Sequence, residues 1–239
     1  MPKKITFKKG GIIFDFDDTI ASTKTGKNIV LKSISSKIYE YLKKRGININ
    51  PSKLYKTICN LTQKMDAKGI YDRNLWWSSV VRKFSKKEPP KSFLDNLTQE
   101  YWKTVIEKST LYRDTISILS YLKNKGYPLG LLTDTDGTKG MKFKRIEALN
   151  LKNWFNAIIV AGEGTRETKL KNTTPFFLIS KKLNLKPEEC VLVGDNPSTD
   201  IRGAKKTGML TILVKRKNNK IKIRPDRIIR RLIELRRIF

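Results

Sequence analysis

The hydrophobic pattern of residues 113–239 alternates between short apolar runs and longer segments with helical spacing. The apolar runs predict buried strands at 127–133, 157–161, 190–195 and 210–214, and one more run directly precedes Asp15. The segments with helical spacing are 115–126, 138–150, 174–185 and 199–208. Strands that alternate with helices in this way predict βαβ units and a parallel sheet. The last stretch, 225–239, interleaves Arg with Ile and Leu and predicts an amphipathic terminal helix over the sheet.

Residues 22–112 show a different pattern. Apolar residues recur at helical spacing in 29–46, 71–84 and 93–108, and no comparable strand run appears. This block therefore predicts a separate helical module, with Trp76 and Trp77 in its core. The predicted organisation is an α/β core from 1–21 and 113–239 with a small inserted α-helical domain at 22–112.

Polar residues stand at the carboxyl ends of the predicted strands. Asp15, Thr133 and Asp195 each follow an apolar run. Ligands of parallel sheets bind beyond the carboxyl ends of the strands, so these remote residues should converge there.

The stretch "DFDDT", residues 15–19, crowds three carboxylates together, and like charges repel one another. It fits an exposed acidic turn, or a nucleophile and an acid/base that share one Mg²⁺. An EF-hand loop is excluded, because that loop needs a longer run of ligands ending in Glu.

Other segments favour the second interpretation. Asp200 follows Asp195 at the start of a predicted helix, and Lys169 and Lys171 stand just before another. Transfer of a phosphoryl group needs such carboxylates, a hydroxyl and an ammonium.

Composition narrows the chemistry. The chain has no histidine and two cysteines, Cys59 and Cys190, so Ser-His-Asp, Cys-His and zinc-ligand schemes are excluded. The cysteines are expected to be free thiols. No apolar run reaches the roughly 18 residues of a membrane helix, and the N-terminus lacks the apolar stretch of a secretory signal, so we expect a cytoplasmic protein without membrane contact.

The formal net charge of +29 suggests anionic partners, with nucleic acid the first to consider; a thermophile-like or lysine-rich surface is the alternative. Basic residues outnumber acidic ones 19 to 7 in 20–112, 17 to 10 in 113–214 and 11 to 2 in 215–239. This spread predicts at most non-specific binding to nucleic acid.

The four segments, in this order, resemble the signature motifs of the haloacid dehalogenase-like hydrolase superfamily. "DFDDT" is similar to its first motif, Thr133 to its second, the Lys169 region to its third and "GDNPSTD" to its fourth. The resemblance covers 11–21 and 113–239. It implies a Rossmann-like core and makes the helical insert a cap of the kind found in phosphoglycolate phosphatases.

The resemblance also implies roles. Asp15 is the nucleophile, and Asp17 first protonates the leaving oxygen and then activates water. Mg²⁺ is held by Asp15, the backbone carbonyl of Asp17, Asp195 and waters, and Asp200 orients a metal-bound water or the lysine. Thr133 and Lys169 bind phosphoryl oxygens, although the motif reads "KLKN" rather than Lys-Pro, which leaves Lys171 as the alternative. Asp18 stands where many members have Gly.

The expected function is Mg²⁺-dependent hydrolysis of a small phosphorylated metabolite through an aspartyl-phosphate. The alternatives are a phosphomutase, which shares the motifs, and a basic nucleic-acid-associated phosphatase or binding protein on the same scaffold. A haloacid dehalogenase uses no metal and lacks an acid at the position of Asp17, so Asp17 argues against it. The sequence does not predict the substrate or the oligomeric state.

Overall fold

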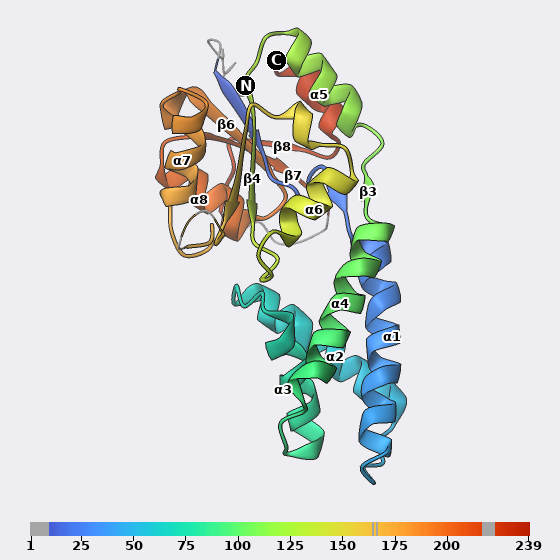
Figure 1. Ribbon diagram of the computed structural model, residues 1–239. Helices are drawn as coiled ribbons and strands as arrows, with labels where there is room; N and C mark the ends of the chain where they lie inside the picture. Colours follow the sequence, from blue (N-terminus) through green and yellow to red (C-terminus); the bar gives the residue numbers. More distant parts are fainter. Residues whose placement is uncertain (1–9, 164, 166, 217–222) are drawn as a thin grey trace. The chain divides into compact units, whose positions relative to one another are not determined.

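Figure 1 shows the computed structural model, which describes residues 10–163, 165, 167–216 and 223–239. By their contacts the residues group into an α/β unit (Met1–Ser22, Thr110–Thr135 and Leu149–Phe239) and a helical unit (Thr23–Ser109 and Asp136–Ala148). The segment 136–148, which the sequence pattern assigns to the core, groups here with the helices.

The α/β unit is built on a six-stranded sheet of order β5-β4-β1-β6-β7-β8, in which all neighbours pair in parallel. The strands are β1 (Gly11–Phe14), β4 (Leu129–Asp134), β5 (Ala157–Ala161), β6 (Cys190–Gly194), β7 (Leu210–Val214) and β8 (Arg227–Ile229). The predicted parallel sheet is thereby confirmed. The chain builds outward from β1 to β5 on one side and from β6 to β8 on the other, so the carboxyl ends of β4, β1 and β6 lie side by side.

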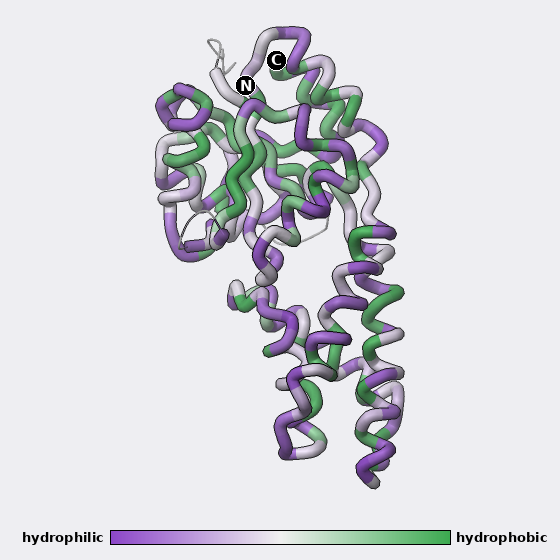
Figure 2. Tube along the Cα trace, in the orientation of Figure 1, coloured by the Kyte–Doolittle hydropathy of each residue, from purple (hydrophilic) through white to green (hydrophobic). Residues whose placement is uncertain are grey.

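Alternating side chains of the strands face opposite layers, as the period of two requires. Ile13, Leu132 and Leu192 pack with α7 (Thr174–Lys182) in one buried cluster, which α8 (Arg202–Lys206) joins through Ala204. Helix α5 (Thr115–Asn124) lies on the other side of the sheet (Figure 1). Figure 2 shows the hydrophobic residues concentrated along the strands between these layers.

Short elements complete this unit: β2 (Ala21–Ser22) and β3 (Thr110–Leu111), which pair in antiparallel fashion, the 3-10 turns η1 (Lys152–Trp154), η2 (Pro187–Glu189) and η4 (Leu232–Arg237), and the π-helical segment η3 (Pro197–Ile201).

The prediction of a terminal helix over 225–239 is wrong. Strand β8 pairs with β7, and the 3-10 turn η4 follows it. Asp226 explains the difference, because its carboxylate accepts hydrogen bonds from the backbone N–H and the hydroxyl of Thr211 on β7, at 2.9 and 2.6 Å. These bonds hold the start of the segment in register with β7 and favour an extended backbone.

The helical unit contains α1 (Lys24–Lys43), α2 (Pro51–Ala67), α3 (Arg73–Ser85), α4 (Lys91–Lys108) and α6 (Met141–Ala148). The side chains of Asn50 and Asp72 cap the first turns of α2 and α3. Trp76 and Trp77 are 1% and 0% exposed, so their predicted place in a core is confirmed. Cys59 and Cys190 are free thiols, as expected.

Candidate active site

Asp15 directly follows β1 and lies at the centre of the sheet edge formed by the carboxyl ends of the strands. Its backbone N–H donates to the carbonyl of Val193 on β6 at 2.9 Å, so the β1–β6 ladder continues to this residue. The side chain is 5% exposed. Its Oδ2 accepts a hydrogen bond from the hydroxyl of Thr19 at 3.0 Å. The carboxylate is therefore held by the loop that it begins.

Lys169 brings a buried cation to the same point. Its Nζ donates to Oδ1 of Asp15 at 2.6 Å and to Oδ1 of Asp200 at 2.7 Å. The backbone N–H of Lys169 donates to the carboxylate of Asp134 at 2.7 Å, which anchors its loop to the end of β4. Lys171, the other lysine considered from the sequence, is exposed.

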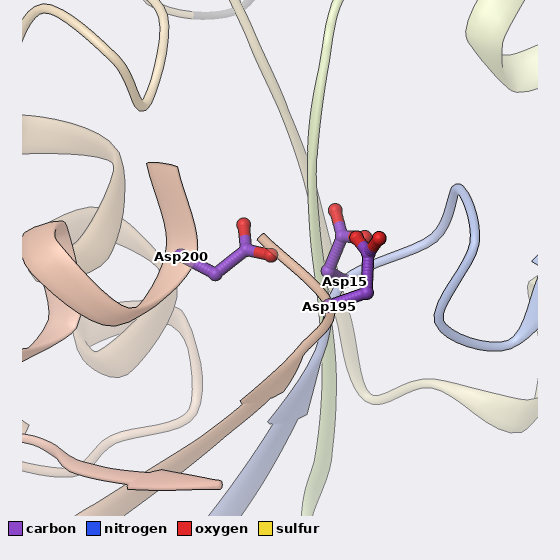
Figure 3. A group of neighbouring side chains, drawn as sticks. All are labelled: Asp15, Asp195 and Asp200. Atoms are coloured by element: carbon purple, nitrogen blue, oxygen red, sulfur yellow. The ribbon is translucent and has the colours of Figure 1, made fainter. Parts of the chain in front are cut away.

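Asp195 and Asp200 complete an acidic cluster with Asp15. One carboxylate oxygen from each lies within 4.8 Å of the others. Figure 3 shows Asp15 and Asp195 at the ends of neighbouring strands, with Asp200 reaching in from a helical segment. The close approach of Asp200 requires glycine at the end of β6, because a Cβ on Gly194 would clash with the Asp200 carboxylate.

The two oxygens of Asp200 are already engaged. Oδ1 accepts from Lys169, and Oδ2 accepts from the backbone N–H of Asn196 at 3.0 Å. Through the first of these bonds Asp200 suits orientation of the lysine. An all-oxygen donor set of this kind fits a hard divalent cation.

Burial and neighbouring charges shift the pKa values of Asp15 and Lys169. Burial raises the pKa of Asp15 to about 7 against the opposing effect of Lys169, and the charges of Asp200 and Asp17 raise it further. Burial alone would lower the pKa of Lys169, but the carboxylates of Asp15, Asp200 and Asp134 hold it well above its usual range. Lys169 is thus a permanent cation between two acids.

Asp17 and Thr133 lie beside this cluster. Asp17 is half-buried, and its charge acts on Asp15. Thr133 is 1% exposed near the end of β4, and its hydroxyl donates a long 3.5 Å bond to the carbonyl of Asp134. Asp18 has a left-handed backbone (φ 59°), which explains why glycine is common at this position of the resembled motif.

Sequence reasoning missed three contributors: Thr19, Asp134 and Asn196. Thr19 is the fifth residue of "DFDDT", so its position in the motif could have indicated that it contributes to the site. Asp134 accepts a hydrogen bond from the backbone N–H of Lys169, and the backbone N–H of Asn196 donates to Asp200. Both contacts form only in the folded chain.

Tyr112, which directly follows β3, is influenced by the charges of this site. Burial and the charges of Asp18 and Asp195 raise the pKa of Tyr112, whereas Ser22 and Arg216 act in the opposite direction. Its ring therefore lies within electrostatic reach of the acidic cluster.

Comparison with known proteins agrees with this geometry. A family model described as haloacid dehalogenase-like hydrolase matches residues 12–214. Glyceraldehyde 3-phosphate phosphatase of Methanopyrus kandleri is 25% identical over 206 residues, 86% of this chain and 83% of that protein. Human N-acylneuraminate-9-phosphatase is 24% identical over 211 residues, 83% of this chain and 79% of that protein.

Among solved structures, a HAD phosphatase from Thermococcus onnurineus is similar with a TM-score of 0.72 and 26% identity, over 96% of this chain and 97% of that one.

Among the residues that the structure describes, no helix combines the length and apolarity needed to cross a bilayer.

Proposed function

The chain belongs to the haloacid dehalogenase-like hydrolase family, and from this premise we propose that it is a Mg²⁺-dependent phosphatase acting through an aspartyl-phosphate on Asp15. As a family member with phosphatase relatives it is a hydrolase of the phosphatase type, and its substrates are small phosphorylated molecules. The observation that carries the mechanistic proposal is the buried Lys169 ammonium, 2.6 Å from Asp15 and 2.7 Å from Asp200.

In the first step, an oxygen of Asp15 attacks the phosphorus of the substrate, and the bond from phosphorus to the ester oxygen breaks. Asp17 gives its proton to the leaving oxygen. Lys169 and Thr133 bind the equatorial oxygens of the transferring group, whose charge they stabilise in a site that excludes most water.

In the second step, Asp17 takes a proton from a water molecule, and the resulting hydroxide attacks phosphorus. The bond from phosphorus to Asp15 then breaks, which releases inorganic phosphate and restores the carboxylate. Asp200 keeps Lys169 directed at Asp15 through both steps.

Asp15, Asp195 and the backbone carbonyl of Asp17 are the groups we assign to Mg²⁺. The cation, when bound, supplies positive charge that offsets the repulsion among these acids and the charge of the phosphoryl group.

For the domains, we propose that 1–21 and 113–239 form the catalytic core and that 22–112 form a cap that selects the substrate. Within the proposed core, the segment 136–148 groups by its contacts with the helices of 23–109, so it is a further candidate for selecting the substrate.

Turnover of p-nitrophenyl phosphate with Mg²⁺, and its loss with EDTA, tests the proposal. A panel of phosphorylated metabolites then identifies the substrate class. Full activity after metal removal contradicts the role of Mg²⁺, and isomerisation of a sugar phosphate without phosphate release identifies a phosphomutase.

A further inference from the structure

Arg216 lies just beyond the end of β7 and holds the loop that follows the nucleophile. Its Nη2 donates to the backbone carbonyl of Thr19 at 2.8 Å. The guanidinium carbon stands 3.6 Å from the centre of the Tyr112 ring, a distance at which cation–π attraction is effective. Among the residues that the structure describes, Arg216 forms no ion pair with a carboxylate, and its buried Nε has no hydrogen-bond partner. The side chain is therefore fixed by one carbonyl and one ring.

Thr19 connects Arg216 to the nucleophile. The residue is completely buried, and its hydroxyl donates to Oδ2 of Asp15 while its carbonyl accepts from Arg216. The loop around it is tight: the backbone N–H groups of Ile20 and Ala21 both donate to the carbonyl of Phe16 at 3.1 Å. A displacement of the Thr19 backbone must consequently move the hydroxyl that orients Asp15.

Tyr112 gives the same arginine a second point of contact. It directly follows β3, and its backbone N–H donates to the carbonyl of Ile20 at 3.2 Å. Arg216 therefore contacts the chain at two points: at Thr19, shortly before the segment 23–109 begins, and at Tyr112, shortly after this segment ends.

We propose that Arg216 is a positioning residue for the reaction, acting on Asp15 through Thr19. In-line attack on phosphorus needs the carboxylate in a narrow range of orientations, and Lys169 and Thr19 each hold one of its oxygens. Arg216 fixes the second of these two supports. The inference rests on the proposed phosphatase activity but concerns a residue outside its chemistry.

A double-mutant cycle on kcat with p-nitrophenyl phosphate tests this inference. Arg216→Met should lower kcat by about tenfold or more with KM little changed, because misplaced reacting groups slow the chemical step. In a Thr19→Val background, where the hydroxyl no longer reaches Asp15, the same change should cost much less. Arg230→Met, at an exposed arginine of the same unit, is the matched control and should leave kcat unchanged.

The inference would be overturned if Arg216→Met lowered kcat equally in both backgrounds or left kcat unchanged. It would also be overturned if Arg230→Met caused the same loss, or if the effect were confined to KM. Melting temperatures of all variants separate positioning from loss of fold. If Arg216→Met does not fold, Arg216→Lys, which keeps the charge and the stem, carries the same cycle. An inactive wild-type enzyme would instead refute the proposed function, so the two failures are distinguishable.

Discussion

The ammonium of Lys169 donates to Oδ1 of Asp15 over 2.6 Å, although 154 positions separate the two residues in the chain. Each comes from a loop at the carboxyl edge of the sheet, and Asp200 holds the lysine from its other side. A buried ammonium between two carboxylates is costly to desolvate and is stable only with this pairing. When the phosphoryl group of the substrate enters this site, it gives Lys169 a third negatively charged partner during the reaction.

The first prediction follows from this pair. Lys169→Ala should lower kcat/KM by roughly 10²-fold or more, because a fixed charge beside the transferring group is worth most in a water-poor site. Lys171→Ala, two residues away and exposed, is the matched control and should have little effect. Steady-state kinetics of both variants decide between them, and the reverse ranking would assign the phosphate contact to Lys171.

For the nucleophile, we predict that Asp15→Asn lowers turnover by roughly 10⁴-fold, since the amide cannot attack phosphorus. Asp18→Asn is a suitable control, because asparagine tolerates the left-handed backbone at that position. Circular dichroism and urea unfolding should show both variants folded. Near-normal turnover by a folded Asp15→Asn protein would rule out Asp15 as the nucleophile.

Mg²⁺ affinity should rise with pH. Burial raises the pKa of Asp15 to about 7, above the 3.8 of an unperturbed carboxyl, so the metal-free protein holds a proton there below that pH. A cation binds the ionised form and must displace this proton. Affinity should therefore fall by about tenfold per pH unit below 7 and level off above it.

Calorimetric titration in buffers of different ionisation enthalpy measures both the affinity and the proton released. Release of a proton at pH 6 and almost none at pH 8.5 is the expected result. An affinity independent of pH from 5.5 to 8 would show that Asp15 is ionised before the metal binds.

Nucleic acid is predicted to bind only non-specifically. The charge of +29 is spread over all parts of the chain, and even the arginine-rich end contributes a strand and a 3-10 turn to the α/β unit. Fluorescence anisotropy should give dissociation constants of ~10⁻⁴–10⁻⁶ M at physiological salt, weakening as salt rises. Nanomolar, salt-resistant binding to one nucleic-acid structure would favour the alternative function.

The sequence predicted five strands of the main sheet, because runs such as 157–161 and 210–214 are apolar and rich in β-branched residues. It missed β8, since interleaved Arg and Ile fit a helix period as well as a strand, and the bonds from Thr211 to Asp226 decide the outcome. Helix α2 was also missed, although Pro51 at its first turn and the Asn50 cap mark its start.

The candidate site residues that lie in motifs could be predicted from the sequence, because the motifs keep a fixed position relative to the ends of the strands. Arg216 was not, since one arginine in a strongly basic segment carries no pattern of its own. Its partners are a backbone carbonyl and a ring from distant segments, and only folding brings them together.

The central claim is a covalent phosphoryl group on Asp15, and trapping this species tests it most directly. Asp17→Asn removes the base that activates water, while p-nitrophenolate leaves readily without a proton. Mixing this variant with p-nitrophenyl phosphate and Mg²⁺ should release one equivalent of nitrophenolate per site in a burst. Mass spectrometry should then find one phosphoryl group on Asp15, absent from the Asp15→Asn/Asp17→Asn double variant. Continued turnover without a phosphorylated enzyme, or a phosphoryl group on another residue, would contradict the account.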